Sequence, residues 1–213
     1  MNRPVVLTQR SIPVEHRGEV GDYLDRRWVE LLSALSQQPL LMLPNHVTAA
    51  RTCLSKQRPA LIILTGGNNL NLPGAGDTSE ARDEVESWLC AQAEADAIPV
   101  LGVCRGAQFL AARAGAMPVQ APGHAGRTHL VEVVTDPGWG WPASFRVTSH
   151  HNWVLPASAL PQRLDVIAVA DDKTVEAFGH RELPQWGLMW HPEREQPGGS
   201  GQNALRSILA GQQ

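Results

Sequence analysis

Short runs of apolar residues alternate along the chain with longer segments in which apolar residues recur every three or four positions. The first pattern is typical of buried strands and the second of amphipathic helices, so the chain predicts an α/β fold. We expect a three-layer sandwich with a central, mostly parallel sheet. The pattern predicts strands over 5–8, 40–43, 60–64, 100–103, 129–134, 166–170, 174–178 and 185–190, and helices over 22–35, 47–57, 78–95 and 202–209, with one more helix after Cys104.

Two stretches depart from the simple alternation of strands and helices. The strands 166–170 and 174–178 are separated by a short polar turn and predict a hairpin. Residues 120–149 are rich in glycine, proline and histidine and contain one clear alternating strand. We interpret this irregular stretch as an insertion that shapes a site inside one domain covering residues 1–213.

The segment around Cys104 combines an apolar run, a cysteine between two glycines and the start of a helical pattern. This is the layout of a nucleophile elbow, in which a strand turns sharply into a helix. Gly102 and Gly106 relieve crowding where the backbone reverses, and the amino end of a helix favours a thiolate. The sequence therefore predicts Cys104 as a nucleophile; the alternative is a structural thiol in a tight turn.

His191 and Glu193 follow the last predicted strand. Because Pro192 disfavours helical geometry in the residue before it, we expect His191 at a strand terminus. The carboxyl ends of parallel strands meet at one edge of a sheet, which would bring His191 close to Cys104. Glu193 is close enough in sequence to orient the imidazole. A cysteine with a distant histidine and carboxylate is the pattern of a catalytic nucleophile.

A glycine pair, Gly66 and Gly67, follows the predicted strand 60–64. Glycine lets the backbone approach a ligand closely and point an N–H group at it. We predict that the N–H groups of Gly67 and Arg105 form an oxyanion hole, which stabilises the negative charge of an acyl-transfer intermediate. A plain tight turn is the alternative interpretation.

Composition narrows the class of protein. The chain has 213 residues and a formal net charge of −3, which gives no reason to expect nucleic acid or an anionic membrane as a partner. No window approaches the ~20 apolar residues of a membrane span, and the first residues lack the apolar region of a signal peptide. Three widely spaced cysteines do not form a disulfide framework and indicate a reducing cytoplasm. We expect Cys53 and Cys90 to be packing residues of helices.

The motifs resemble the class I glutamine amidotransferase superfamily, and within it the γ-glutamyl hydrolases related to γ-glutamyl-GABA hydrolase, the peptidase C26 group. The resemblance rests on residues 102–108 and 190–193, on Arg82-Asp83 followed by Glu86, and on residues 147–151. It implies a flavodoxin-like fold, no cofactor, and hydrolysis of a γ-glutamyl amide through a thioester on Cys104. His191 and Glu193 would complete the catalytic triad.

The resemblance also implies contacts to a small γ-glutamyl substrate. Gln108 would line the γ-glutamyl pocket, and Ser149, His150 and His151 would hold the α-amino and α-carboxylate groups. Asn69, Thr148 and Trp153 depart from the residues usual in the group, which leaves the identity of the leaving amine open.

The histidines of the insertion allow two further interpretations. Arg127 and His129 suit contacts with a polar or anionic leaving part. His124 and His129 with His150 and His151 could also form a metal site, but the sequence has no cysteine pair or acidic residue at ligand spacing. We therefore expect no metal.

Three functions remain as alternatives. The first is a free-standing γ-glutamyl hydrolase, and the residues from His191 to Glu195 are similar to members that act on nucleotide-linked amidates. The second is a glutaminase subunit that delivers ammonia to a synthase partner. The third is an inactive binding domain, which the presence of Cys104, His191 and Glu193 disfavours. A homodimer is a further possible assembly.

Overall fold

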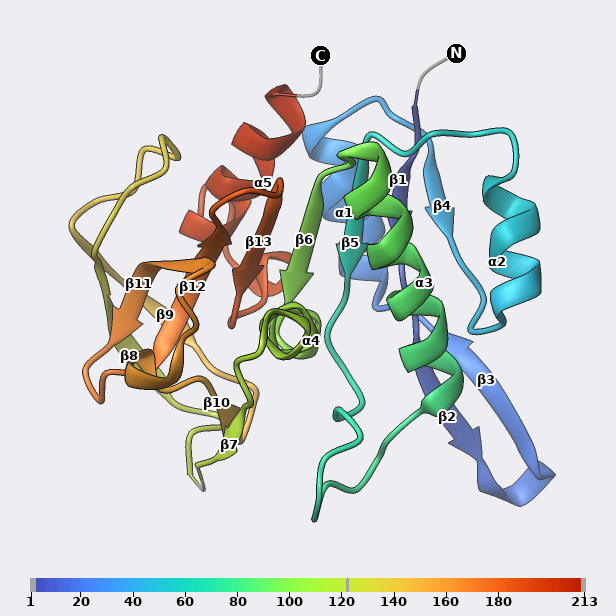
Figure 1. The fold of residues 1–213 in the computed structure, drawn as a ribbon, viewed down its shortest axis with the longest axis horizontal. Helices are drawn as coiled ribbons and strands as arrows, with labels where there is room; N and C mark the ends of the chain where they lie inside the picture. The colour runs from blue at the N-terminus through green and yellow to red at the C-terminus, as the bar shows by residue number, and fades with distance from the viewer. Residues whose placement is uncertain (1–2, 122, 212–213) are drawn as a thin grey trace.

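A computed structural model describes residues 3–121 and 123–211, which form a nine-stranded sheet flanked by helices (Figure 1). The strands are β1 (Val5–Leu7), β4 (Leu40–Met42), β5 (Leu61–Leu64), β6 (Val100–Val103), β8 (Thr128–Val133), β9 (Ser144–Thr148), β11 (Leu164–Ala170), β12 (Val175–His180) and β13 (Gln185–Leu188). Their order is β4-β1-β5-β6-β13-β12-β11-β8-β9. Strands β4 to β13 in this order pair in parallel, and the rest extend the sheet antiparallel.

Helices cover both faces of the sheet. They are α1 (Arg26–Leu35), α2 (Val47–Leu54), α3 (Glu80–Asp96), α4 (Arg105–Ala114) and α5 (Ser200–Ala210). Leu61 and Ile63 of β5 pack in a core cluster with residues of α1 and α5, whereas Ile62 and Leu64 pack with residues of α2, α3 and α4. Because successive residues of a strand point to opposite faces, these clusters form the two layers of core in the predicted three-layer fold.

The N-terminal region contains a hairpin that the apolar pattern did not predict. Strands β2 (Arg10–Val14) and β3 (Glu19–Tyr23) pair antiparallel as a separate two-stranded sheet. Every residue of β3 is exposed, so the strand lacks the apolar alternation that indicates burial. The predicted helix over 22–35 was therefore wrong at its start: α1 begins at Arg26, where the Asp25 side chain accepts a hydrogen bond from the Arg27 N–H group.

The cysteines of the helices differ in their surroundings. Cys90 of α3 is fully buried, as expected of a packing residue. Cys53 of α2 is exposed, and the expectation that it packs in the core was wrong. Among the residues of α2, Ala50 is buried and faces the core; Cys53, three positions further on, lies outside this buried stripe. No helix in the described part of the chain is long and apolar enough to cross a membrane.

Candidate active site

Three neighbouring parallel strands deliver the candidate residues to one edge of the sheet. Strands β5, β6 and β13 lie side by side, and their carboxyl ends are followed by Gly66-Gly67, Cys104 and His191, respectively. Chain segments far apart in sequence thus meet where open α/β sheets bind ligands. This convergence was predicted from the strand pattern.

The backbone at Cys104 has the geometry of a nucleophile elbow. Cys104 has φ +52° and ψ −107°, a conformation that side-chain-bearing residues rarely adopt. A Cβ atom at Gly102 would lie 2.4 Å from the Gly106 carbonyl oxygen, and one at Gly106 would lie 2.0 Å from the Leu64 carbonyl oxygen. Both positions therefore require glycine, and the close contact of α4 with β5 and β6 depends on them.

His191 and Glu193 form a buried pair beside Cys104. His191 Nδ1 lies 2.5 Å from Glu193 Oε1, and both residues are 7% exposed. Gly66 lies against the imidazole, because a Cβ atom there would be 2.5 Å from His191 Cε1 and 3.5 Å from Cys104 Cβ. The carboxylate fixes the orientation of the ring, so that the second ring nitrogen serves the thiol.

The charges around His191 favour its protonated form. Burial lowers the pKa of His191, but the negative charge of Cys104 and the hydrogen bonds to Cys104 and Glu193 outweigh burial and raise this pKa to about 10. An imidazolium at neutral pH can donate a proton to a leaving group.

A buried arginine supports the loop after β5 from behind. The Arg82 side chain is 0% exposed, and its guanidinium donates hydrogen bonds to the carbonyl oxygens of Thr65 at 2.5 Å, Gly66 at 3.1 Å and Gly67 at 2.5 Å. Its Nε donates to Glu86 Oε1 at 2.8 Å. Three successive carbonyl groups are thereby held on the side of α3.

Arg105 extends this network to the elbow. Its guanidinium forms ion pairs with Asp83 and Glu86, and its side chain is 2% exposed. Burial lowers the pKa of both the Arg82 and the Arg105 guanidinium, and the charge of Asp83 opposes this effect. The backbone N–H of Arg105 is the first of α4 and has no partner within the helix. It is therefore available to a ligand at Cys104.

A cavity of about 460 Å³ opens over Cys104. Its polar lining includes, of the predicted site residues, Gly67, Cys104, Arg105, Gln108, His150, His151 and His191. Gln108 Nε2 donates to the Trp153 carbonyl oxygen at 3.0 Å, and His150 lies edge-on to His191 with ring centroids 5.4 Å apart. Arg10 and Arg194, which the sequence did not single out, also line this cavity.

Other predicted residues lie elsewhere. Ser149 is 0% exposed and its hydroxyl lies 3.3 Å from His129 Nδ1, behind the wall of the Cys104 cavity. Arg127 and His129 line a different cavity of about 320 Å³, together with His124 and Asp172. The structure thus does not bring the side chains of the insertion to Cys104.

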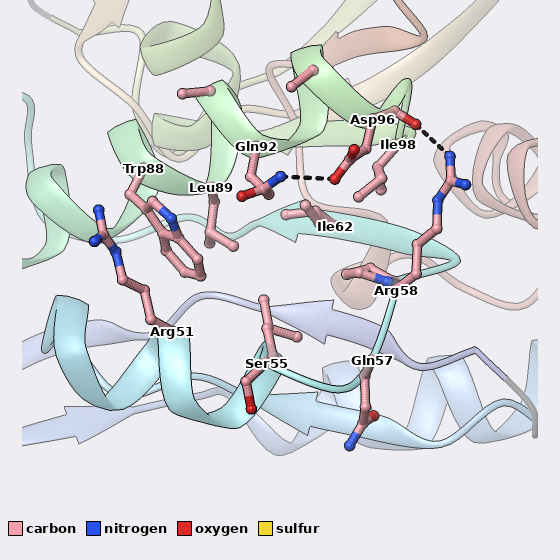
Figure 2. A pocket seen from close by; sticks show the side chains of 14 residues that line it. Arg51, Ser55, Gln57, Arg58, Ile62, Trp88, Leu89, Gln92, Asp96 and Ile98 are labelled. Carbon is pink, nitrogen blue, oxygen red and sulfur yellow. Dashed lines mark hydrogen bonds between the residues drawn. The ribbon is translucent and has the colours of Figure 1, made fainter.

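A larger cavity, about 740 Å³, lies between α2 and α3 (Figure 2). The Arg51 guanidinium stands 5.7 Å from the ring centroid of Trp88 at one end, and Arg58 donates to the Asp96 carbonyl oxygen at the other. The residues that line it include neither Cys104 nor His191. Size alone would misplace the chemistry.

An acidic residue that the sequence did not suggest lies beside the histidines of the insertion. Glu176 on β12 is 0% exposed, and its carboxylate is 3.2 Å from His129 Nε2. Burial raises the pKa of Glu176. The signal available in the sequence was a charged residue between Val175 and Ala177 inside a predicted strand, where an apolar residue is usual.

Comparison with known proteins agrees with this geometry. Residues 8–193 match the family described as Peptidase C26. The chain belongs to the peptidase C26 family. This places it in the class I glutamine amidotransferase superfamily, as its motifs suggested, and makes it an enzyme of that family.

The peptidase C26 protein has relatives with different activities. It is 33% identical over 134 residues to "Gamma-glutamyl-CDP-amidate hydrolase" of Campylobacter jejuni subsp. jejuni serotype O:2, covering 63% of this chain and 62% of the relative. It is 33% identical over 150 residues to "Carbamoyl phosphate synthase small chain" of Symbiobacterium thermophilum, covering 68% of this chain and 37% of the relative. The chain thus spans less than two thirds of the length of these curated relatives.

A solved structure shares the fold. The crystal structure of a putative GMP synthase protein from Thermoplasma acidophilum superposes with a TM-score of 0.73 at 20% identity, covering 99% of this chain and 96% of that chain. At this identity the likeness establishes the fold alone. It agrees with the predicted flavodoxin-like, glutamine amidotransferase architecture.

Proposed function

We propose that the chain is a cysteine-dependent hydrolase that cleaves the γ-glutamyl amide bond of a small compound. The observation that supports this most directly is the presence of Cys104, in a strained elbow, and of the His191–Glu193 pair in one cavity. A nucleophile, a base and a group that orients the base are the requirements of covalent acyl transfer.

In the first half-reaction the Cys104 thiolate attacks the γ-carbonyl carbon of the substrate. The N–H groups of Gly67 and Arg105 stabilise the resulting oxyanion. The imidazolium of His191 donates its proton to the leaving nitrogen, the C–N bond breaks, and the amine departs. The γ-glutamyl group remains on Cys104 as a thioester.

In the second half-reaction water replaces the amine. His191, now neutral, takes a proton from the water as its oxygen attacks the thioester carbonyl. The C–S bond breaks, glutamate is released, and the thiolate–imidazolium pair returns. Glu193 keeps the imidazole in one orientation through both steps.

Two cavities that meet at His191 suit the two parts of such a substrate. The Cys104 cavity contains Gln108 and polar groups for a zwitterionic glutamyl end. A neighbouring cavity of about 700 Å³ also includes His191 and Arg194 in its lining and adds Phe145 and Arg146. Arginine and an aromatic ring are suited to a phosphoryl group and a base. We infer that this neighbouring cavity takes the leaving part, as a nucleotide-linked amidate.

The alternative is a glutaminase subunit that passes ammonia to a synthase partner. The similarity to a carbamoyl phosphate synthase small chain favours it. Both functions use the same thioester chemistry, and they differ in the leaving group.

The test compares substrates of the isolated protein. Free glutamine, a γ-glutamyl alkylamine and a γ-glutamyl phosphoramidate of a nucleotide are supplied at equal concentration, and glutamate release is measured. We expect the phosphoramidate to give the highest kcat/KM and an analogue without the α-carboxylate to be a poor substrate. The Cys104→Ala and Cys104→Ser variants should fold and be inactive. Glutamine hydrolysed best, and stimulated by a synthase, would favour the glutaminase alternative.

A further inference from the structure

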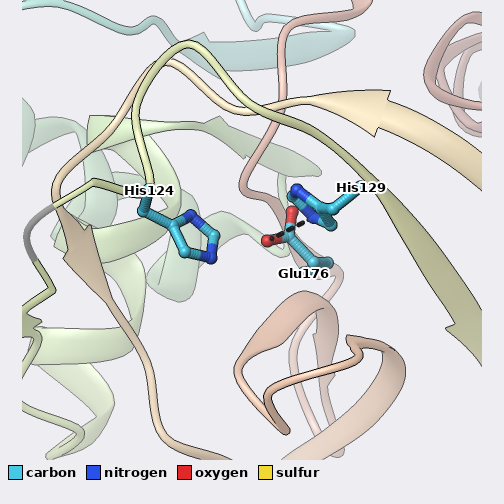
Figure 3. A group of neighbouring side chains, drawn as sticks. All are labelled: His124, His129 and Glu176. Carbon is cyan, nitrogen blue, oxygen red and sulfur yellow. Dashed lines mark ion pairs between the residues drawn. The ribbon is translucent and has the colours of Figure 1, made fainter.

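A second cluster of chemically capable side chains lies apart from Cys104. His124 and His129 come from the insertion and Glu176 from β12, and one ligand atom from each lies within 4.8 Å of those of the others (Figure 3). Segments far apart in the sequence converge here, because β8, which contains His129, and β12, which contains Glu176, both pair with β11.

The carboxylate of Glu176 is buried without hydrogen bonds. Its side chain is 0% exposed, and within residues 3–121 and 123–211 neither of its oxygens has a hydrogen-bond partner. His129 Nε2 is 3.2 Å from Glu176 Oε1 but is not aligned with it as a hydrogen-bond donor. A buried carboxylate is unfavourable unless a cation or donors compensate its charge.

Each histidine has one ring nitrogen engaged by an outer group and one that is unpartnered. His129 Nδ1 lies 3.3 Å from the Ser149 hydroxyl oxygen, and His124 Nε2 lies 3.4 Å from Asp172 Oδ2. The other nitrogens, His129 Nε2 and His124 Nδ1, are buried and have no hydrogen-bond partner among the described residues. Metal-binding histidines have this arrangement, because the outer hydrogen bond fixes the tautomer and directs the other lone pair at the ion.

We propose that His124, His129 and Glu176 bind one divalent transition-metal ion, with Zn²⁺ as the best match. Two imidazoles and a carboxylate are a common zinc donor set. Two ligands about 2.0–2.1 Å from a tetrahedral ion lie about 3.3 Å from each other. The 3.2 Å between His129 Nε2 and Glu176 Oε1 fits that spacing.

The third ligand can move inward to complete the set. His124 lies in the loop before β8, between Gly123 and Gly126, which both have positive φ. An adjustment of the loop brings its ring nitrogen to the ion without disturbing the sheet. With the ion bound, the negative charges of Glu176 and Asp172 are both balanced.

The metal would act as a structural tie rather than in the cleavage reaction. It would fasten the insertion to β12 and hold Ser149 through His129. His151, which lines the Cys104 cavity, packs against His124 with ring centroids 5.0 Å apart. Metal binding would thereby order the wall formed by residues 149–153.

Zinc titration of the full chain tests the proposal. The Cys104→Ser background is used, because the thiolate and His191 would otherwise compete for the metal. The protein is stripped with a chelator, Zn²⁺ is titrated by competition with a chromophoric chelator, and the retained metal is measured by mass spectrometry. We expect one ion per chain and a rise in Tm with Zn²⁺. Co²⁺ should give tetrahedral absorption bands without thiolate charge transfer.

Variants identify the ligands. His124→Ala, in a loop and therefore compatible with folding, should weaken binding by at least roughly 10–100-fold, and Asp172→Asn by roughly tenfold. His16→Ala, at an exposed histidine, is the matched control and should bind like its parent. Retention of less than one ion per chain, or equal affinity in His124→Ala and its parent, would overturn the proposal. Glu176 and His129 would then be a metal-free pair sharing a proton.

Discussion

Replacement of Arg82 by methionine should reduce both stability and catalysis, because this one side chain holds the loop that precedes the elbow. The guanidinium donates to three successive carbonyl oxygens, at Thr65, Gly66 and Gly67, and to Glu86. Methionine fills a similar volume without the charge or the donors. The three carbonyl groups and one carboxylate oxygen then lose their buried cation.

The burial of the Arg82–Glu86 pair sets the magnitude of this effect. Both side chains are 0% exposed and their atoms are 2.8 Å apart. Breaking a fully buried pair lowers the free energy of unfolding by about 3–5 kcal/mol. The matched control is Arg113→Met, which removes a 2.9 Å ion pair to Glu94 whose side chains are 32% and 36% exposed. Such surface pairs contribute about 0–1 kcal/mol.

Urea unfolding of both variants measures this difference, and the kinetics of thioester formation measure the positioning of the loop. A displacement of the oxyanion loop by about 1 Å should lower kcat on the order of 10²-fold, with a smaller change in KM. Arg113→Met should leave kcat unchanged. If Arg82→Met were no less stable than Arg113→Met, the argument from burial would fail. Lost stability with an unchanged kcat would refute the positioning role.

Three further predictions concern the elbow and the histidine. Gly106→Ala should lower the free energy of unfolding by about 1–3 kcal/mol or more, measured by urea unfolding, because its Cβ would meet the Leu64 carbonyl oxygen at 2.0 Å. His191→Ala should lower kcat by about 10²–10⁴-fold and Glu193→Gln by less, since the base remains; equal losses would contradict the orienting role. The pKa of His191 is raised to about 10, above its ordinary value of 6.5, so its contribution to stability is complete below about pH 6.5 and is lost as the pH rises through 10. Urea unfolding between pH 6 and pH 10 should show that decline, and His191→Gln should reduce it.

The parallel half of the sheet could be predicted because burial on both faces leaves a clear sequence pattern. Strand β5 has four buried residues in a row, and the predicted strand 60–64 differs from it by one residue at its start. The hairpin of β2 and β3 leaves no such pattern, since its residues are exposed or half-buried. Its formation depends on backbone pairing and on neighbours such as Asn68, whose side chain bonds to the backbone of Ser11.

The site could be predicted where chemistry and backbone geometry coincide, as at Cys104 between glycines and at His191 before proline. Side chains whose position depends on tertiary packing could not. Nothing in the sequence near His129 indicates that Glu176 will lie 3.2 Å away, because strand order decides that contact. Likewise Arg194 follows Glu193 in sequence, but only the fold places it on the cavities at both sides of His191.

The structure also explains why two motifs that are distant in the sequence occur together. The arginine after the nucleophile is 2% exposed, and a buried guanidinium requires anionic partners. Asp83 and Glu86 supply them, and Glu86 also binds Arg82. Each cation therefore depends on acids from the other motif, and the charges balance only when all four residues are present. A leucine at position 105 would leave Asp83 and part of Glu86 unpaired, so a chain with that residue must change α3 as well. The Arg82-Asp83-x-x-Glu86 motif and the Cys-Arg-Gly elbow thus form one electrostatic unit, in which the support of the oxyanion loop and the support of the nucleophile are physically the same.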